Sequence, residues 1–185
     1  MGGAILVSRC YQSPVRIAAG SMPLRGIEAE IAFRFDRDLP PRALPYGYAE
    51  VAEAATALAA IEIVDSRFRN YRTAPLLDKA ADCVSNGGLV AGALQPSWRS
   101  LDLAQVAVTL MIDDRPAIRK IGGHPTGDPL LPAVALVNAR RSGAGVRSGQ
   151  IMTTGTYTGL TFVEPTATVV AIFDGVGAAE LQFVP

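Results

Sequence analysis

The chain has 185 residues, a length that favours a single domain spanning 1–185. Hydrophobic residues make up 49% and charged residues 18%, which is ample material for a folded core. Because 17 basic residues balance 17 acidic ones, no net field attracts nucleic acid or an anionic membrane. No apolar stretch reaches the roughly 18 residues that span a bilayer. We therefore expect neither nucleic acid nor a membrane as a partner.

The N-terminus and the two cysteines indicate the compartment. The segment MGGAILVSRC at 1–10 has a short apolar run with no basic region ahead of it, which makes it a poor signal peptide. Cys10 and Cys83 form no CxxC pair, and so sparse a set fits a reducing compartment better than a disulfide scaffold. We expect a cytoplasmic protein, with a Cys10–Cys83 bridge as the less favoured alternative.

The first third of the chain predicts a strand–loop–helix–strand unit. A short apolar run at 4–8 predicts a strand, and the strict alternation of GIEAEIAFRF at 26–35 predicts another. Three prolines at 36–45 predict a loop. The alanine-rich segment 48–60 predicts a helix that runs directly into a β-branched strand at 61–65. A helical crossover of this kind can return the second strand beside the first.

The remainder predicts a β-rich α+β protein. Segment 66–88 is mixed and polar, which is typical of a loop with a helical turn, and 104–120 predicts a hairpin around an Asp-Asp-Arg-Pro turn. Segment 128–143 predicts a helix that begins at Asp128 and ends at Gly143. The last third is a series of β runs interrupted by Gly and Pro. His124, the only histidine, lies among glycines and prolines, and we expect it in a surface loop.

Three glutamates are the candidate ligands of a metal ion. In the 26–35 strand the alternation places Glu28 and Glu30 on one face, opposite a wholly apolar face. Glu62 lies at the entry to the 61–65 strand, which the predicted crossover brings alongside. Carboxylates that converge from two strands repel one another, and a hard cation such as Mg²⁺ or Mn²⁺ relieves that repulsion. The alternative is an ordinary solvated strand face.

Four stretches of the chain resemble a known family: GIEAEIAFRFDRDLP, AIEIVDSRF, ADCVSNGGLVAG and SGQIMTTGTYTG. From about Pro23 to the C-terminus the chain is similar to the 2-hydroxypenta-2,4-dienoate (2-keto-4-pentenoate) hydratases of the fumarylacetoacetate hydrolase superfamily, which also contains the 2-oxo-3-hexenedioate decarboxylases. The resemblance implies a mixed β-roll or barrel-like fold of the fumarylacetoacetate hydrolase C-terminal domain type. It also implies that Glu28, Glu30 and Glu62 hold the metal.

The same resemblance implies a reaction. The substrate, a small 2-oxo or 2-hydroxydienoic acid of aromatic catabolism, chelates Mg²⁺ or Mn²⁺ through its 1-carboxylate and 2-oxygen, and water adds at C4. One alternative is a decarboxylase that releases CO₂ from a longer diacid. Another is a truncated, non-catalytic member that serves as a structural partner subunit, because family members carry a longer N-terminal region. We expect a homo-oligomer, or a complex with a related hydratase or decarboxylase.

Further residues are candidates for the chemistry. Lys79 lies where the hydrolase branch of the superfamily carries a lysine near its metal, although it can equally be a solvated surface lysine. Asp65 is a candidate catalytic group, or a structural partner of Arg67 that supports the site. In TTGTYTG at 153–159, Thr154 and Gly155 are candidates for binding a substrate carboxylate, and the alternative is an ordinary β-turn.

Overall fold

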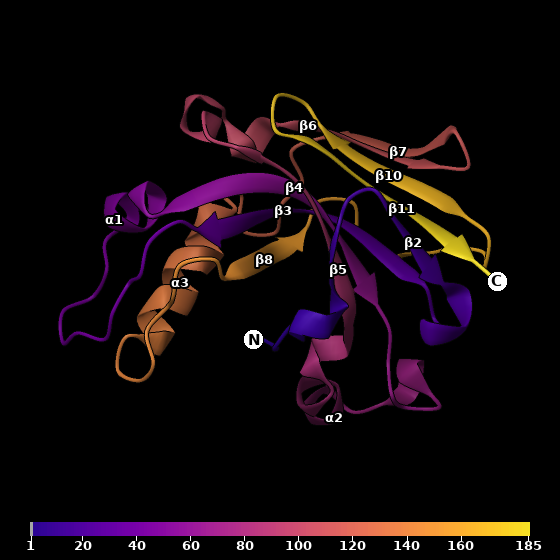
Figure 1. Ribbon diagram of the computed structural model, residues 1–185, viewed down its shortest axis with the longest axis horizontal. Coiled ribbons are helices and arrows are strands. Elements are labelled where there is room, and N and C mark those ends of the chain that lie inside the picture. The colour runs from indigo at the N-terminus through magenta and orange to yellow at the C-terminus, as the bar shows by residue number, and fades with distance from the viewer. Residues whose placement is uncertain (1) are drawn as a thin grey trace.

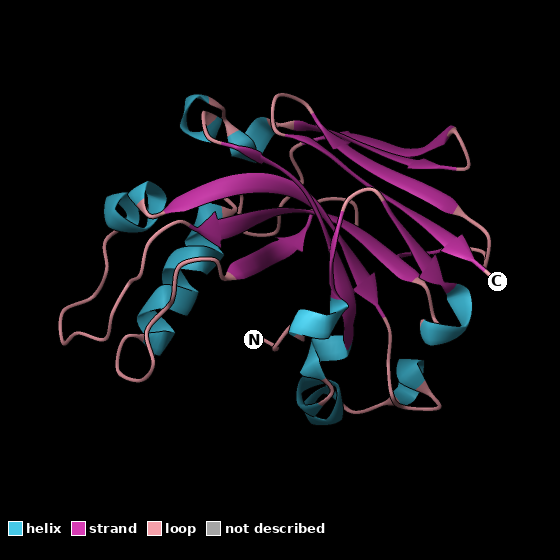
Figure 2. Cartoon of the chain, viewed as in Figure 1, coloured by secondary structure: helices cyan, strands magenta, loops and turns pink. Residues whose placement is uncertain are grey.

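The computed structural model describes residues 2–185 and consists of two β-sheets packed against each other, with three α-helices at the periphery (Figures 1 and 2). The larger sheet has the strand order β1-β5-β4-β3-β8, and the two-residue strand β9 also pairs with β3. The smaller sheet has the order β2-β11-β10-β6-β7. Both orders are open at their ends, and residues 2–185 form no closed barrel. The predicted β-rich α+β class is confirmed.

The bounds of the elements are as follows. The larger sheet contains β1 (Cys10–Gln12), β3 (Gly26–Phe35), β4 (Ala55–Val64), β5 (Asn86–Gln95), β8 (Ile151–Thr156) and β9 (Thr161–Phe162). The smaller sheet contains β2 (Val15–Ala18), β6 (Ala107–Ile112), β7 (Arg115–Ile121), β10 (Thr168–Phe173) and β11 (Gly177–Val184). The helices are α1 (Tyr48–Glu53), α2 (Leu76–Ala81) and α3 (Leu130–Arg140).

The main core lies between the sheets. Strand β11 packs against β4 and β5, and the inward side chains of both sheets belong to one hydrophobic cluster. Gly92 on β5 permits this close approach, because a Cβ there would clash with the carbonyl oxygen of Ala178 on β11. None of the helices formed by residues 2–185 combines the length and the apolar character that crossing a bilayer requires.

Several predicted elements are confirmed. The 26–35 strand is β3, with the bounds predicted, and the 104–120 hairpin is β6 and β7 joined at Asp113 and Asp114. The 128–143 helix is α3, and Asp128 accepts a hydrogen bond from the Leu130 amide at its start (2.8 Å). Both cysteines are free thiols. The alternation of β3 also holds, since Ile27, Ala29, Ile31, Phe33 and Phe35 all lie in the main core.

The predicted helix at 48–60 is wrong in its second half. Helix α1 ends at Glu53, and the alanines that follow belong to β4, the central strand between β3 and β5. Ala55, Ala57 and Ala59 are fully buried there, so tertiary packing overrides the helix propensity of alanine. Strand β4 lies beside β3, as predicted, and runs antiparallel to it.

Two further predictions are corrected. The apolar run at 4–8 forms no strand, since Val7–Arg9 make a single 3₁₀ turn in which Val7 is 89% exposed, and the first strand begins at Cys10. The loop predicted at 66–88 contains α2 as its helical turn but ends earlier, because β5 begins at Asn86.

Candidate metal centre

The three glutamates meet on one face of the larger sheet. In the antiparallel register of β3 and β4, Glu28 lies directly opposite Glu62, and Glu30 is the next residue along β3 on the same face. Each side chain offers a carboxylate oxygen, and these oxygens all lie within 4.8 Å of one another. The predicted convergence is therefore present, although through an antiparallel pair where a crossover was expected. That the three glutamates ligate a metal stays a prediction.

Glu30 is the most enclosed member of the cluster, with 1% of its surface exposed. Its Oε2 accepts hydrogen bonds from the backbone amides of Thr154 (3.1 Å) and Gly155 (2.9 Å) on β8. The register of β3 and β8 shifts at this point, which turns both amides toward the carboxylate. Gly155 has φ = 116°, a backbone conformation that favours glycine. A glycine is therefore suited to this position, where the backbone amide donates to Glu30.

Glu62 is held by a side chain from the neighbouring strand. The amide Nδ2 of Asn86, the first residue of β5, donates to Oε1 of Glu62 (2.7 Å). The turn that delivers Asn86 is unusual, because Cys83, Val84 and Ser85 all have positive φ between 54° and 62°. Non-glycine residues in this region are strained, and such strain gathers at functional sites. The strained turn at 83–85 is therefore a structural support of the carboxylate cluster.

The electrostatics of the cluster favour a bound cation. Burial, followed by the charge of Glu62, raises the pKa of Glu28 to about 7. Burial also raises the pKa of Glu30 well above its usual range and raises the pKa of Glu62. Within residues 2–185, none of the three forms an ion pair with a basic side chain. Protons or a cation must therefore offset the clustered negative charge.

The donor set fits a hard divalent ion. Three carboxylate oxygens within 4.8 Å of one another are the kind of ligand that Mg²⁺ and Mn²⁺ prefer, and three protein ligands leave positions for water or a chelating substrate. The amides of Thr154 and Gly155 and the amide of Asn86 fix the orientation of the carboxylates, as partners of ligating groups do in metal sites.

Thr154 and Gly155, predicted to bind a substrate carboxylate, lie beside the cluster. Their amides already donate to Glu30, and the Thr154 hydroxyl donates to the carbonyl of Ile31 (2.7 Å). These contacts support a role in orienting Glu30, and binding of substrate by the pair stays a prediction.

Asp65 is buried just beyond β4, and its Oδ1 accepts a hydrogen bond from the Leu24 amide (3.1 Å). The expected pairing of Asp65 with Arg67 is wrong, because Arg67 forms its ion pair with Asp82 and also donates to the carbonyl of Asn86 (2.9 Å). Arg67 thus braces the turn that carries Asn86. The catalytic role predicted for Asp65 stays a prediction.

Lys79 lies on α2, and its ammonium nitrogen is 4.8 Å from the centroid of the Tyr71 ring. Burial raises the pKa of Tyr71, and the charge of Glu28 adds to this. The role of Lys79 in catalysis stays a prediction.

Sequence reasoning missed His124. It is buried (6% exposed), so the expected surface position is wrong. The Thr126 amide donates to its Nδ1 (3.3 Å), which leaves the proton on Nε2 to bond the carbonyl of Thr154 (2.9 Å). Burial lowers the pKa of His124. The histidine thus fixes the segment of β8 whose amides hold Glu30, and nothing in its loop of glycines and prolines signals that contact.

Known proteins resemble the chain along nearly all of its length. The 2-keto-4-pentenoate hydratase of Burkholderia vietnamiensis is 33% identical over 183 residues, which are 98% of this chain and 69% of the relative. The chain belongs to the 2-keto-4-pentenoate hydratase family. No protein-family model matches the sequence.

Solved structures share the fold of this hydratase family member. The 4-oxalocrotonate decarboxylase from Pseudomonas putida G7, complexed with magnesium and adipate, has a TM-score of 0.84 at 21% identity, covering 98% of this chain and 69% of that one. A protein of the fumarylacetoacetate hydrolase family from Yersinia pestis CO92 has a TM-score of 0.64 at 18% identity, covering 98% and 82%. The fold is therefore that of the fumarylacetoacetate hydrolase superfamily, as the sequence resemblance implied.

Proposed function

We propose that this chain is a metal-dependent carbon–oxygen lyase, a hydratase that adds water to a 2-hydroxydienoate or 2-oxo-enoate such as 2-hydroxypenta-2,4-dienoate in the catabolism of aromatic compounds. The observation that supports it most is the convergence of three carboxylate oxygens within 4.8 Å in a member of the 2-keto-4-pentenoate hydratase family. Glu28, Glu30 and Glu62 would hold Mg²⁺ or Mn²⁺. The bound ion would supply Lewis acidity toward the 2-oxygen of the substrate.

The residues of the chain would position the reacting molecule. The cluster lies on one face of the sheet, with Glu28 and Glu62 half-buried and Glu30 fully buried, so a chelating acid reaches the centre from the side of the two half-buried glutamates. Lys79, behind the ring of Tyr71, is the candidate for moving a proton near the substrate. Asp65, through its bond to Leu24, would hold the loop that precedes β3.

We expect residues 1–185 to act as one domain, in the cytoplasm, where free thiols such as Cys10 and Cys83 persist. Leu76 and Leu77 on α2 are 67% and 78% exposed, which supports association into a homo-oligomer or a complex with a related hydratase or decarboxylase. Mass photometry with and without such a partner tests both forms.

The first experiment separates metal binding from turnover. Calorimetric titration with Mn²⁺ should give saturable binding to the wild type and none to Glu28→Gln, whereas Glu180→Gln, an exposed change on β11, should bind like the wild type. Loss of the dienol absorbance of 2-hydroxypenta-2,4-dienoate then measures hydration. Saturable Mn²⁺ binding without turnover would support the non-catalytic partner subunit, and the absence of Mn²⁺ binding would contradict the proposal altogether.

A 2-oxo-3-hexenedioate-type decarboxylase is the second candidate. It is supported by the TM-score of 0.84 to 4-oxalocrotonate decarboxylase, a structure complexed with magnesium and adipate. Release of CO₂ from 2-oxo-3-hexenedioate, measured beside the hydration assay on the same preparation, decides between the two reactions.

A further inference from the structure

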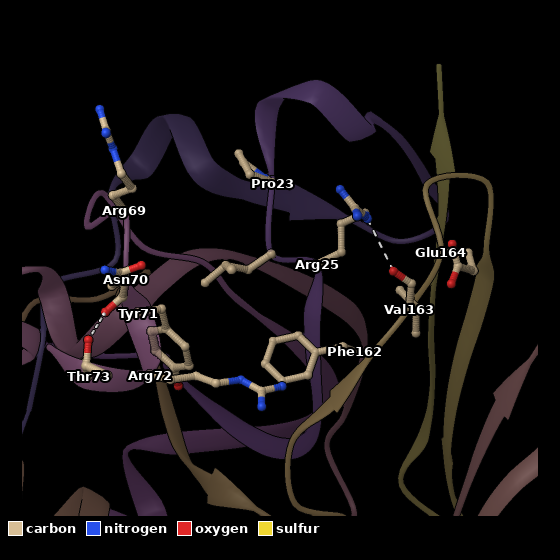
Figure 3. Close-up of a pocket in the computed structure, with 11 residues that line it drawn as sticks. Pro23, Arg25, Arg69, Asn70, Tyr71, Arg72, Thr73, Phe162, Val163 and Glu164 are labelled. Carbon is tan, nitrogen blue, oxygen red and sulfur yellow. Dashed lines mark hydrogen bonds between the residues drawn. The ribbon is translucent and has the colours of Figure 1, made fainter.

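The loop between β7 and α3, residues 122–129, places a buried histidine beside strand β8. His124 is the only histidine of the chain, and 6% of its surface is exposed. A cavity of about 500 Å³ opens elsewhere, where Figure 3 shows Tyr71, Arg72 and Phe162, and the residues of 2–185 that line it do not include His124. A ligand in that cavity does not meet the imidazole, so an effect of His124 on the carboxylate cluster passes through protein groups.

His124 contacts both residues whose amides hold Glu30. Its Nε2 donates to the carbonyl of Thr154 (2.9 Å), and the amide of Thr154 donates to Oε2 of Glu30 (3.1 Å). A Cβ at Gly155 would lie 3.5 Å from Nε2 of His124, so the imidazole lies against the backbone of this glycine. The amide of Gly155 also donates to Oε2 of Glu30 (2.9 Å). The imidazole is thus joined to the carboxylate through two consecutive residues of β8.

Two of these hydrogen bonds share one peptide group. The Thr154 carbonyl, which accepts from His124, and the Gly155 amide, which donates to Glu30, belong to the same peptide bond. Because a peptide group is planar, a bond that fixes its oxygen also fixes the direction of its N–H. Hydrogen bonds in series polarise one another, so donation to the oxygen makes the N–H a stronger donor. Both the direction and the strength of the amide that holds Glu30 therefore depend on the imidazole.

The imidazole is itself held in the tautomer and orientation that this requires. The amide of Thr126 donates to Nδ1 of His124 (3.3 Å), so the ring proton lies on Nε2. The ring packs against Tyr157, with centroids 5.1 Å apart, and the phenol of Tyr157 donates to the carbonyl of Leu103 (3.0 Å). His124 therefore presents one fixed donor to β8.

We propose that His124 is a positioning residue of the metal centre: through the Thr154–Gly155 peptide group, its Nε2–H aims the amide that holds Glu30 and thereby sets the affinity of the centre for its divalent ion. In this role the imidazole contacts neither the ion nor the substrate. The inference rests on the proposed function, because it takes Glu30 as a metal ligand.

Two substitutions separate the donor from the ring. His124→Phe keeps an aromatic ring against Tyr157 and removes the donor, whereas His124→Gln removes the ring and keeps an amide donor. Calorimetric titration with Mn²⁺ should show about tenfold weaker binding to His124→Phe, the usual effect of losing a partner of a ligand. His124→Gln should recover most of the lost affinity. The electron paramagnetic resonance spectrum of bound Mn²⁺ should change in His124→Phe and resemble that of the wild type in His124→Gln.

Tyr157→Phe is the matched control. It removes a buried hydrogen bond of the same kind, from a side chain to the carbonyl of the distant Leu103, and leaves the donor of His124 in place. Its melting temperature should fall, as that of His124→Phe should, but its Mn²⁺ affinity should equal that of the wild type. Thermal melts of the metal-free variants thus distinguish a loss of affinity from a general loss of stability.

A measurement on the wild type needs no substitution. Because His124 is the only histidine, labelling histidine with ¹⁵N in the untagged protein gives one pair of ring-nitrogen resonances. We expect a protonated Nε2 and an unprotonated Nδ1. Titration with Mg²⁺ should shift the Nε2 resonance with the midpoint that calorimetry gives for Mg²⁺, since the ion and the hydrogen bond are coupled through Glu30. A proton on Nδ1, or an Nε2 resonance that saturating Mg²⁺ does not move, overturns the inference.

The outcomes separate the two proposals. Mn²⁺ binding to His124→Phe with the affinity of the wild type overturns the inference and leaves the proposed function standing. Equally weakened binding in His124→Phe and His124→Gln also overturns it, because the donor is then not what the centre requires. A wild type that binds no Mn²⁺ overturns the proposed function, and the inference falls with it.

Discussion

One face of β3 carries Ile27, Ile31 and Phe33 into the core between the sheets, whereas the opposite face carries Glu28 and Glu30 into the candidate metal centre. The two sets of side chains alternate along the backbone of this one strand. The apolar side chains are removed from water without losing hydrogen bonds, so their burial stabilises the fold. The carboxylates are also removed from water, but burial raises their pKa values, so holding them together costs stability.

The difference teaches that the side chains of the main core and those of the candidate centre occupy separate faces of one strand, although the acidic face also carries Ala32 into a second, smaller apolar cluster. Changes on the apolar face should unfold the protein without altering the centre directly, and changes on the acidic face should disable the centre while sparing the fold. This separation is the property that the following substitutions test.

The largest expected effect is on the apolar face. Phe33 is fully buried and packs edge-to-face on Trp98, with ring centroids 5.1 Å apart. Phe33→Ala should lower the free energy of unfolding by about 4 kcal/mol through lost burial and the cavity left behind. In a domain of this size that corresponds to a melting temperature about 10 °C lower. Denaturation monitored by circular dichroism measures the loss. A decrease below about 1 kcal/mol would show that β3 is not a principal support of the core.

The next effect is on the acidic face. Glu30→Gln keeps the shape of the side chain but removes one ligand charge, and should weaken Mn²⁺ binding at least about 100-fold, which is about 3 kcal/mol. The melting temperature of the metal-free variant should equal or exceed that of the wild type, because like-charge repulsion is relieved. Calorimetry measures the affinity and thermal melts measure the stability. Unchanged Mn²⁺ affinity would show that the ion binds without Glu30.

The alternation that creates the two faces could be predicted from the sequence. A strand has a period of two residues regardless of its surroundings, so GIEAEIAFRF alone places Glu28 and Glu30 together and Phe33 opposite them. To predict that Glu62 lies beside them, one must also know that β3 pairs with β4. That pairing was expected through a helical crossover, and the structure provides it through an antiparallel pair of strands.

The errors have a common physical cause. The alanines at 55–60 have high helix propensity, but a strand buried between two others requires small side chains, and this tertiary demand prevails. His124 and the left-handed turn at 83–85 were also beyond prediction, because each bonds a segment distant in the chain: His124 bonds the Thr154 carbonyl, and the Ser85 carbonyl accepts from the Asp65 amide. The sequence near a residue does not show which distant residue it will contact. The roles of His124 and of the turn at 83–85 were therefore missed, whereas the three glutamates were found.

A smaller effect should come from the supports of the centre. Asn86→Ala removes the amide that donates to Glu62, and should lower Mn²⁺ affinity about tenfold, since partners of ligands contribute less than ligands themselves. Gln95→Ala, at the far end of the same strand, removes a hydrogen bond to the Gly175 carbonyl and is the matched control. Calorimetry with Mn²⁺ compares the two. Equal affinities in both variants would show that Glu62 needs no support from β5.

The smallest effect is on the pH dependence of the metal-free protein. The pKa of Glu28 is raised from 4.5 to about 7 in the folded state, so the folded protein binds a proton more tightly than the unfolded chain does. The contribution of Glu28 to the free energy of unfolding should be greatest below about pH 4.5 and should fall as the pH rises toward 7. Glu62 and Glu30, whose pKa values are also raised, add to the fall with the same sign. Since Glu28 is partly exposed, solvent screening limits its share to about 1 kcal/mol, or about 2–4 °C in melting temperature.

Thermal melts at pH 5 and pH 7.5, with a chelator present, measure this fall. Saturating Mn²⁺ should reverse it at pH 7.5, because the ion binds the deprotonated carboxylates of the folded state only. Glu28→Gln should flatten the dependence between the two pH values, whereas Phe33→Ala should lower both melting temperatures by the same amount. The prediction is contradicted if the metal-free wild type becomes more stable from pH 5 to pH 7.5, in parallel with the Glu28→Gln variant. The carboxylates would then not repel one another enough to lower the stability of the metal-free protein.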